Sequence, residues 1–493
     1  LHGCNANNCD AARVRARALG VGTTPPGAAL ELHNVHLTNG EAPEGGAVAL
    51  YGTTKYATLT MYGGSISVSK AVGGAEGSQT NGGGGAVLLQ GSGDQMMPTD
   101  VRVITGLFIH GASILGCEAL TDGGGLLVNN GPFRLVGATI AGCTAGMYGG
   151  GLSNKLSSPS VIVGGSFSGC TAAIGGGGYH QQEGNVGISG GATWEGCTTT
   201  NMESTFSFFN TEVMGGGLLA TDRANLDLAD VTIRGSRGGN LNLRGDSQLV
   251  MVRTLIEGGV GKWGAGLGMV GGEATVSDST IRGTNAGKFN GGGGAYLRSG
   301  ATLTCDRCRI VENAGMYGGG MVVEGGATAT VRDSIIANNG GASGQYNGGM
   351  AGPRPTPRGG CLFGGGFVVW QGATLTIVHS EVEANTCRYG GGIQVALAST
   401  LVVRESKLTR NRCNMDGCAI GLGDLGFLVE MTKGAEALAQ VATNPKVQLL
   451  DVQIEHECNM GRYSQRWNGD LGQGPWRGII PVFSYGKGRA LDW

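Results

Sequence analysis

Glycine clusters that recur at a fixed interval restrict the folds that this chain can adopt more than any other feature. Runs of three or more glycines begin at Gly123, Gly149 and Gly175, each 26 residues after the last, and the same interval separates Gly364 from Gly390. A constant period of roughly 20 to 50 residues is typical of solenoids. Glycine supplies 99 of the 493 residues, but there are only 12 prolines and no Gly-x-y triplet repeat, which excludes a collagen-like chain.

Each repeat contains three short segments with the two-residue alternation of β-strands. In the period that begins at Gly318 these segments fall at 321–323, 328–331 and 334–336, and no repeat shows the 3.6-residue period of an amphipathic helix. Three strands in 26 residues can form one coil of a parallel β-helix, with successive coils about 4.8 Å apart. We therefore predict an all-β fold, a right-handed parallel β-helix solenoid of about 12 coils.

The repeats divide the chain into three predicted segments. Residues 29–413 form the β-helix, and residues 1–28 form an N-terminal cap or continue a missing region. Residues 414–493 form a C-terminal cap that contains one further coil at 447–455 and an aromatic tail. Caps are expected because the open ends of a solenoid expose unpaired strand edges.

Stacking of the coils in register turns equivalent residues of successive repeats into columns. One predicted inward column consists of Val276, Leu303, Ala329, Leu375 and Leu401. A second consists of Ile310, Ile336, Val382 and Leu408. Three residues after each member of the second column lies a predicted ladder of Asn313, Asn339, Asn385 and Asn411. We expect these asparagines to adopt a left-handed or bridge conformation and to hydrogen-bond the equivalent residue of the next coil.

The repeat pattern resembles that of a known family. Gly-Gly-Ala/Gly-aliphatic, followed by an apolar residue, two further residues and Asn, is similar to the repeat of the polymorphic outer membrane proteins, surface passengers with a pectin-lyase-like right-handed β-helix. The resemblance covers about residues 29–413 and implies that fold. The chain departs from the family pattern by replacing Phe with Ile, Val, Leu or Trp, and Asn with Cys in four early coils.

Cysteine occupies the asparagine position in these four coils. These four cysteines form a column and are spaced 26 or 27 residues apart: Cys117, Cys143, Cys170 and Cys197. In-register residues on neighbouring parallel strands have Cα atoms about 4.8 Å apart, within the range that a disulfide spans. Disulfides Cys117–Cys143 and Cys170–Cys197 are therefore one interpretation, and a column of buried reduced thiols is the other.

The other candidate cysteines form smaller groups. One column, in which two members are predicted to pair, comprises Cys361, Cys387 and Cys413. Cys305 and Cys308 lack the second pair of a zinc ribbon and the βαβ context of a redox motif, which favours packing or a local disulfide. Cys4 and Cys9 complete the candidates. Structural disulfides would indicate an oxidising compartment and hence an extracellular or cell-surface location. Because the total of 13 cysteines is odd, at least one cannot pair within the chain.

The outward acidic residues lack the pattern of a glycan-cleaving site. Hydrolysis on this scaffold needs paired carboxylates on neighbouring coils, and a lyase needs Ca²⁺-binding acids together with a base. One outward column instead has mixed charge: Arg307, Asp333, His379 and Glu405. We predict no catalytic, cofactor-binding or metal-ligating residue, and we interpret His33 and His36 beside Glu31 as surface residues.

Threonines recur on the outward side of the predicted strands. Five share one phase: Thr275, Thr302, Thr328, Thr374 and Thr400. Three coils add a second threonine two residues later: Thr304, Thr330 and Thr376. We interpret the two rows as a flat partner-binding face, which also resembles the ice-binding face of some β-helices; the alternative is a general preference of threonine for exposed strand positions. The aromatic tail, with Trp467 and Trp476, is a second candidate partner surface or part of the cap.

Charge and hydropathy exclude some partners. Lys plus Arg (34) nearly balances Asp plus Glu (36), so neither nucleic acid nor an anionic membrane is an expected partner, and no apolar stretch is long enough for a transmembrane segment.

We predict a non-catalytic structural or adhesive β-helix module of a cell surface or extracellular assembly, without a cofactor, that binds proteins or surface glycans along its faces; end-to-end or lateral self-association is a further option. The alternatives are a polysaccharide lyase or glycoside hydrolase of the pectin-lyase-like class, and an intracellular scaffold with reduced cysteines.

Overall fold

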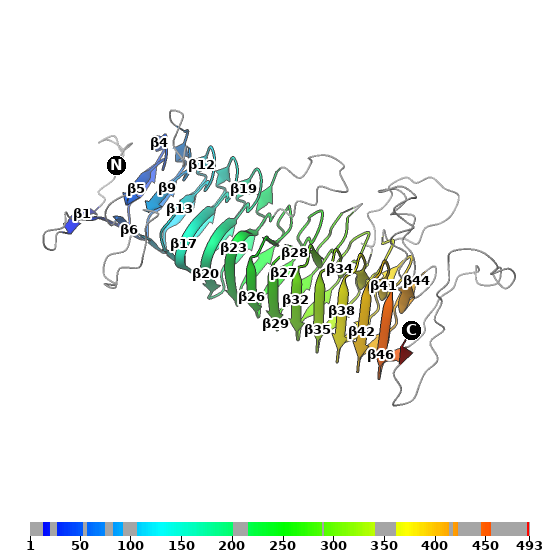
Figure 1. Ribbon diagram of the computed structural model, residues 1–493. Coiled ribbons are helices and arrows are strands. Elements are labelled where there is room, and N and C mark those ends of the chain that lie inside the picture. Colours follow the sequence, from blue (N-terminus) through cyan, green and yellow to red (C-terminus); the bar gives the residue numbers. More distant parts are fainter. Residues whose placement is uncertain are drawn as a thin grey trace, which may run out of the picture. The chain divides into compact units, whose positions relative to one another are not determined.

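The chain consists of two units, each a right-handed parallel β-helix. The computed structural model describes residues 13–19, 27–52, 57–73, 82–91, 106–200, 215–287, 290–340, 361–413, 418–422, 445–454 and 491–492, and every regular element in these ranges is a β-strand. Unit 1 comprises Leu1–Ser204 and Met214–Leu255, and unit 2 comprises Thr205–Val213 and Ile256–Trp493. Within each unit, successive coils lie side by side as parallel strands (Figure 1), which confirms the predicted fold class.

Each coil of unit 2 contributes a leading, a middle and a trailing strand to three parallel stacks. The leading strands are β28 (Leu267–Val270), β31 (Ala295–Arg298), β34 (Met321–Val323), β37 (Phe367–Val369), β41 (Ile393–Val395) and β45 (Ile420–Leu422). The middle strands are β29 (Glu273–Ser277), β32 (Thr302–Asp306), β35 (Thr328–Arg332), β38 (Thr374–Val378), β42 (Thr400–Arg404) and β46 (Lys446–Leu450). The trailing strands are β27 (Leu255–Glu257), β30 (Thr280–Arg282), β33 (Arg309–Val311), β36 (Ile335–Ala337), β39 (Glu381–Glu383), β43 (Lys407–Thr409) and β47 (Gln453–Ile454). Two short corner strands follow, β40 (Thr386–Cys387) and β44 (Arg412–Cys413).

Unit 1 is built in the same way, except that three long strands occupy both the leading and the middle positions. These are β17 (Leu152–Val163), β20 (Tyr179–Ser189) and β23 (Leu218–Ala229). The other leading strands are β5 (Val48–Gly52), β9 (Val87–Gly91), β13 (Leu126–Asn129) and β25 (Leu241–Arg244), and the other middle strands are β2 (Gly27–His33), β6 (Ala57–Tyr62), β10 (Gly106–His110), β14 (Phe133–Val136) and β26 (Gln248–Val252). The trailing strands are β3 (His36–Thr38), β7 (Ser65–Ser67), β11 (Ser113–Leu115), β15 (Thr139–Ala141), β18 (Ser166–Ser168), β21 (Thr193–Glu195) and β24 (Thr232–Arg234). The corner strands are β4 (Glu41–Ala42), β8 (Lys70–Ala71), β12 (Glu118–Ala119), β16 (Thr144–Ala145), β19 (Thr171–Ala172) and β22 (Thr198–Thr199).

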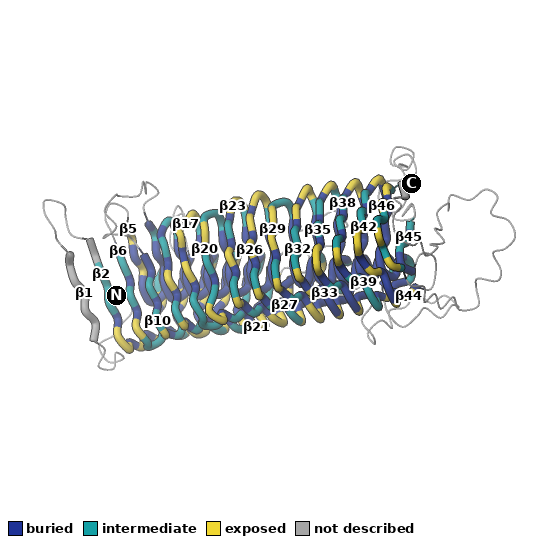
Figure 2. The backbone as a smooth tube through the Cα atoms, turned by 90° about the horizontal axis from the view of Figure 1, so that it is seen from below, coloured by how far each residue is buried: buried dark blue, intermediate teal, exposed yellow. Residues whose placement is uncertain are grey.

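Alternation of inward and outward residues along the strands builds the core. Figure 2 shows buried and exposed residues alternating along each coil. The second predicted inward column is confirmed: Ile310, Ile336, Val382 and Leu408 lie in register. The first column is confirmed for Leu303, Ala329, Leu375 and Leu401, but its next member is Ala274. The predicted member Val276 is wrong, because it lies opposite Cys305.

A residue with positive φ marks the corner after the trailing strands. In four coils of unit 1 this residue is a glycine, with φ between 56° and 62°: Gly116, Gly142, Gly169 and Gly196. In four coils of unit 2 other residues take this conformation, with φ between 52° and 60°: Glu312, Asn338, Ala384 and Arg410. Each of the four in unit 2 directly precedes a member of the asparagine ladder, so the left-handed alternative predicted for the ladder asparagines is wrong, and the left-handed residue lies one position earlier. The bend one position earlier directs the asparagine side chain into the buried corner.

A short antiparallel strand borders the parallel stack in each unit. In unit 1, β1 (Arg13–Leu19) pairs antiparallel with β2 from Arg13↔His33 to Leu19↔Gly27. In unit 2, β48 (Leu491–Asp492) pairs antiparallel with β46. The strands β46 and β47, which lie where a further coil is predicted, pair in parallel with β42 and β43. An antiparallel neighbour covers a strand edge that would otherwise be open to pairing with another chain.

Replacing Gly150 with alanine is expected to destabilise unit 1 strongly. A Cβ at Gly150 would overlap the carbonyl oxygens of Gly177 and Thr171, and the main chain cannot move away without breaking hydrogen bonds between coils. We expect the free energy of unfolding, measured by urea denaturation, to fall by about 3 kcal/mol or more. Gly187→Ala is the matched control in the same unit, because a Cβ at Gly187 meets no atom within 4 Å; its effect should stay below about 1 kcal/mol. Equal losses for both variants would contradict this account.

Candidate functional site

The outward side of the middle strands in unit 2 carries a regular array of threonines. One row comprises Thr302, Thr328, Thr374 and Thr400. The other comprises Thr275, Thr304, Thr330 and Thr376. These eight residues, here called the threonine face, are half-buried or exposed, and they alternate with fully buried residues such as Leu303 and Ile377. The array is therefore an outer surface on a packed wall.

The register corrects the predicted rows at one position. Thr275 lies opposite Thr304, whereas Thr302 lies opposite Glu273. The alignment error is two residues, so Thr275 still points outward but belongs to the second row. Each row therefore runs over four consecutive coils.

Charged residues line the corner beside the threonine face, directly after the middle strands. Nε and Nη2 of Arg307 donate to the two carboxylate oxygens of Asp278 on the neighbouring coil, at 2.7 and 2.9 Å. His379 lies 2.7 Å from Glu405 and 3.8 Å from Asp333. The column of mixed charge predicted from the sequence is thus an ion-paired border. One pair of neighbouring acids adjoins it, because Glu405 and Asp451 directly follow the register partners Arg404 and Leu450.

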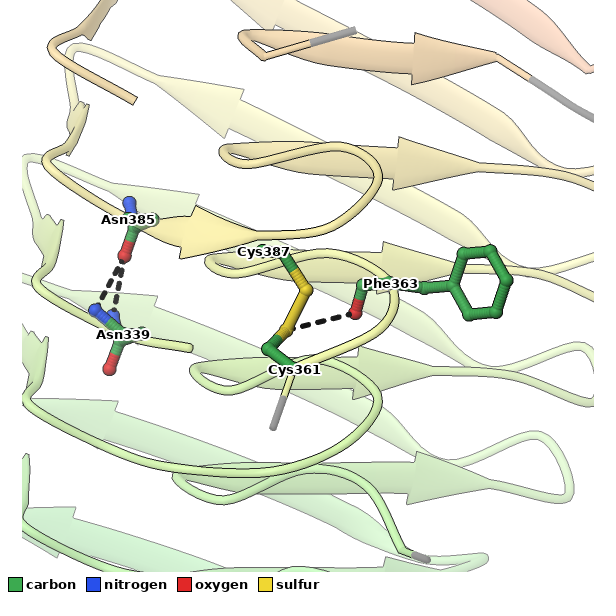
Figure 3. Close-up of a disulfide and its surroundings, with 5 residues drawn as sticks. All are labelled: Asn339, Cys361, Phe363, Asn385 and Cys387. Carbon is green, nitrogen blue, oxygen red and sulfur yellow. Dashed lines mark hydrogen bonds between the residues drawn. A yellow bond between two sulfur atoms is a disulfide. The ribbon is translucent and has the colours of Figure 1, made fainter. Parts of the chain in front are cut away.

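The asparagine ladder is a continuous hydrogen-bonded column in unit 2. Its buried members are Asn313, Asn339, Asn385 and Asn411. Nδ2 of Asn339 donates to Oδ1 of Asn385 at 3.0 Å (Figure 3) and to the carbonyl of Ile310 at 2.8 Å. Oδ1 of Asn339 accepts from the main-chain amide and Nδ2 of Asn313, at 3.0 and 3.1 Å. The side-chain amide therefore uses both its donors and accepts two bonds, which offsets the cost of burying it.

In unit 1 the same corner position holds the cysteine column. Cys117, Cys143, Cys170 and Cys197 are buried and stacked in consecutive coils, but all four are free, so the predicted disulfides Cys117–Cys143 and Cys170–Cys197 are wrong. Each thiol points toward a carbonyl of the preceding coil, as Sγ of Cys143 does toward Ile114 at 3.7 Å. This repeated orientation places the sulfur atoms alongside one another, whereas a disulfide needs two side chains turned toward each other. The alternative interpretation, a stack of reduced thiols, describes the column.

Two disulfides lie in the part of unit 2 that the structure describes. Cys361–Cys387 joins neighbouring coils, with 4.9 Å between the Cα atoms (Figure 3). The third member of this predicted column, Cys413, bonds to Cys418 at a Cα separation of 4.8 Å. Cys418 was not predicted to pair, because it lies off the 26-residue spacing that selected Cys361, Cys387 and Cys413.

Among the remaining candidates, the structure describes Cys305 and Cys308. Cys305 and Cys308 are buried and free. The alternative of a local disulfide between them is therefore wrong, and the alternative of a packing role is confirmed. Cys308 takes a serine position of its column, since its main-chain amide donates to Oγ of Ser334 at 2.9 Å. Four further candidates lie outside the described residues: Cys4, Cys9, Trp467 and Trp476.

A buried acid, Glu324, lies on the outer side of the leading strands in unit 2. The Tyr296 hydroxyl donates to one carboxylate oxygen at 2.5 Å, and the Trp370 indole N–H donates to the other. Nε of Arg298 is 3.6 Å from the first oxygen. Burial raises the pKa of Glu324. Because both oxygens already have donors, a substrate would have to displace a neighbouring side chain to reach this carboxyl group.

Aromatic residues from successive corners cover this acid. Tyr317 stacks on Phe363 with ring centroids 6.0 Å apart, and Phe363 stacks on Tyr389 at 5.2 Å. Tyr317 also stacks on Trp370 at 5.9 Å. The rings contact one another, so the cluster seals the outer side of the leading strands. It was not predicted, although Tyr317, Phe363 and Tyr389 each directly precede a glycine run of the repeat.

Unit 1 carries a column of hydroxyl residues that was not predicted. The outward position of consecutive trailing strands holds Ser65, Ser113, Thr139, Ser166, Thr193 and Thr232. All six are half-buried. The signal was available in the sequence, since each is followed by a large apolar inward residue and all but Ser65 have a glycine three residues later, at the corner.

A second unpredicted feature of unit 1 is the buried His180. Nδ1 lies 3.4 Å from Oγ of Ser153, Nε2 lies 3.1 Å from Oγ1 of Thr221, and the ring stacks on Tyr148 at 4.6 Å. Burial lowers the pKa of His180 to about 3, so the ring is neutral at physiological pH. Ser153 is fully buried, and this Ser–His contact is therefore closed to a substrate.

Neither a metal-binding cluster nor a membrane-spanning helix occurs among the described residues. Among the described residues, no group of three or more His, Cys, Asp or Glu side chains could hold a metal ion. His33 contacts Glu31 at 2.6 Å and His36 contacts Ser65 at 2.8 Å, both at the surface. No helix in the described ranges is long and apolar enough to cross a bilayer.

Comparison with known proteins identifies the repeat region. A family model described as a right handed beta helix region matches residues 216–429, which include the threonine face, the asparagine ladder and both disulfides. No curated protein and no solved structure matches the sequence. The family model agrees with the observed β-helix, while the finer resemblance to the polymorphic outer membrane proteins stays a prediction.

Asn339→Ala is expected to reduce the stability of unit 2 markedly. The substitution removes four hydrogen bonds and leaves buried polar atoms of Asn313 and Asn385 short of partners. We expect the free energy of unfolding in urea to fall by about 3 kcal/mol or more. The adjacent Asn338→Gly is the control: Asn338 is exposed with φ 56°, so glycine should leave stability within about 0.5 kcal/mol or raise it. A larger loss for Asn338→Gly than for Asn339→Ala would refute the ladder's role.

The raised pKa of Glu324 predicts a pH-dependent contribution to stability. Burial disfavours the carboxylate in the folded chain, so the stabilising contribution is complete below the unfolded pKa of about 4.3 and is lost as the pH rises through the raised folded pKa. Glu324→Gln removes this titration at nearly constant volume. We expect the stability of the wild type relative to Glu324→Gln, measured by urea unfolding from about pH 4 to about pH 8, to decrease with rising pH. A difference that does not change with pH would show that burial does not control this group.

Proposed function

We propose that this chain is a non-catalytic structural or adhesive module of a cell surface or extracellular assembly, which binds protein or surface-glycan partners along its β-helix. The threonine face carries the proposal. It presents two rows of short hydroxyl side chains on consecutive coils, at a coil spacing of about 4.8 Å. The match to a right-handed β-helix region supports a module of this kind.

Rigidity of the threonine face favours binding. Threonine is restricted at χ1, and its main chain is fixed on both sides by hydrogen bonds to neighbouring coils, so little side-chain entropy is lost when a partner docks. Beneath it lie fully buried residues such as Ala329, Val331 and Leu375. The hydroxyl and methyl groups offer hydrogen bonds and apolar contact without a charge that must be desolvated.

Several carboxylates form ion pairs with basic residues of the neighbouring coil, which supports a structural role for these charges. Glu257 contacts Arg282 at 2.7 Å, and Glu381 contacts Lys407 at 2.9 Å. A glycan-cleaving enzyme would instead need two acids that converge on one substrate bond. Each exposed ion pair of this kind stabilises the fold by at most about 1 kcal/mol, but each also links one coil to the next in register.

The disulfides support the proposed location outside the cytosol. Cys361–Cys387 and Cys413–Cys418 are structural bonds in unit 2, and such bonds persist mainly in oxidising compartments. The buried reduced thiols of unit 1 are compatible with that setting, because they are closed to solvent and hence to oxidants. Reduced cysteines throughout the chain, found by mass spectrometry under non-reducing conditions, would favour the intracellular scaffold.

Thr330→Lys is expected to abolish binding by the threonine face. Thr330 lies between Thr304 and Thr376 in the second row, so a lysine there adds a long charged side chain at the centre of the face. We expect the fraction of protein retained on insoluble cellulose, chitin or cross-linked pectate to fall at least about tenfold on any support that retains the wild type.

Thr280→Lys provides the matched control, because Thr280 is half-buried on a trailing strand of the same unit but outside the threonine face. This variant should bind as the wild type does, and both variants should keep the wild-type melting temperature. Equal retention of the two variants would rule out the threonine face as the binding surface. Release of soluble oligosaccharides from pectate by the wild type would favour the enzymatic alternative.

A further inference from the structure

We propose that the cysteines of unit 2 form a disulfide-exchange site, in which Cys387 can bond either to Cys361 or to Cys413. The four cysteines of the site are Cys361, Cys387, Cys413 and Cys418. The inference concerns covalent chemistry that the proposed binding function does not include, and it does not depend on that function.

The register gives Cys387 two equivalent neighbours. On one side it bonds to Cys361, with Cα atoms 4.9 Å apart. On the other side it is the direct register partner of Cys413, where β40 pairs in parallel with β44. In-register residues of neighbouring parallel strands are about 4.8 Å apart, a distance that disulfides accommodate. Three consecutive coils thus place their cysteines in one column, and the middle cysteine is within bonding reach of both others.

The main chain around the column need not move when the bond changes partner. The amide of Thr386 donates to the carbonyl of Asn339 at 2.9 Å, and the amide of Arg412 donates to Asn385 at 2.8 Å. These bonds hold the corner strands in register on either side of Cys387. Exchange therefore requires only rotation of the cysteine side chains, which are all buried.

The exchange begins with reduction of one disulfide. A small dithiol transfers two electrons to Cys413–Cys418, so that both sulfurs become thiols and the dithiol becomes a cyclic disulfide. Cys413 then loses its proton and attacks Sγ of Cys387, which forms the Cys387–Cys413 bond and breaks Cys361–Cys387. Cys361 leaves as a thiolate and takes up a proton. The second step changes no oxidation state, and it moves the cross-link between coils by one coil.

The test uses the full chain with the substitution Cys418→Ser, which leaves Cys413 without its partner. After acid quenching and alkylation, trypsin and endoproteinase Glu-C cut at Arg388 and Glu383, which separates the three remaining cysteines of the column. Mass spectrometry then quantifies the linked peptides. We expect both Cys361–Cys387 and Cys387–Cys413, in amounts within about tenfold of each other, because the two spacings are equivalent.

Cys413→Ser is the matched control, since it frees Cys418 but removes the register partner; it should retain Cys361–Cys387 alone. Recovery of Cys361–Cys387 alone in Cys418→Ser, with Cys413 fully alkylated, would overturn the proposal. Should Cys418→Ser fail to fold, the wild type treated with limiting dithiothreitol gives the same answer: the Cys387–Cys413 bond together with alkylated Cys361 supports exchange, and its absence at every degree of reduction refutes it.

Discussion

Main-chain hydrogen bonding between consecutive coils, kept in register, is the interaction on which the rest of this structure depends. It continues through the corners as well as the strands: the amides of Gly364 and Gly365 donate to the carbonyls of Tyr389 and Gly390, at 2.9 and 3.1 Å. The backbones come so close there that a Cβ at Gly365 would overlap the carbonyl oxygen of Gly391. The glycine runs therefore follow from close stacking of coils, and they do not indicate a flexible chain.

The corner after the trailing strand shows how one geometric requirement accommodates two chemistries. Both units need a positive φ before the corner residue. In Gly142-Cys143 glycine adopts it without strain, whereas in Ala384-Asn385 an alanine does so, at a cost of about 1 to 2 kcal/mol. The Asn385 amide donates to Asn411 and to the carbonyl of Ile336, at 3.1 and 2.9 Å, and these bonds offset the strain. A thiol is a much weaker hydrogen-bond donor, so it would offset less of this strain. This explains why a glycine, which adopts a positive φ without strain, precedes each cysteine of the column.

The same stacking separates the side chains that stabilise from those that are available to a partner. Asparagines, serines and thiols in the corners bond along the column and are buried, and charges such as Arg307 and Asp278 neutralise each other at the border. The threonine face lies between these features with neither buried amides nor ion pairs of its own. The proposed adhesive role relies on this surface because it is rigid, uncharged and repeated from coil to coil, and so offers many equivalent weak contacts.

The 26-residue period and the two-residue alternation were sufficient to predict the β-helix, its strands and the side on which each residue lies, because these depend on local sequence alone. The register was not predictable where coils differ in length. From Glu273 to its partner Thr302 the coil has 29 residues, and an alignment error of two residues keeps outward residues outward, so Thr275 was placed in the wrong row without any visible conflict. Spacing likewise could not decide which cysteines bond, since bonding depends on side-chain direction: the Cys143 thiol turns toward a carbonyl, whereas Cys361 and Cys387 meet. These outcomes, and the burial of Glu324, required the three-dimensional packing of residues from different coils.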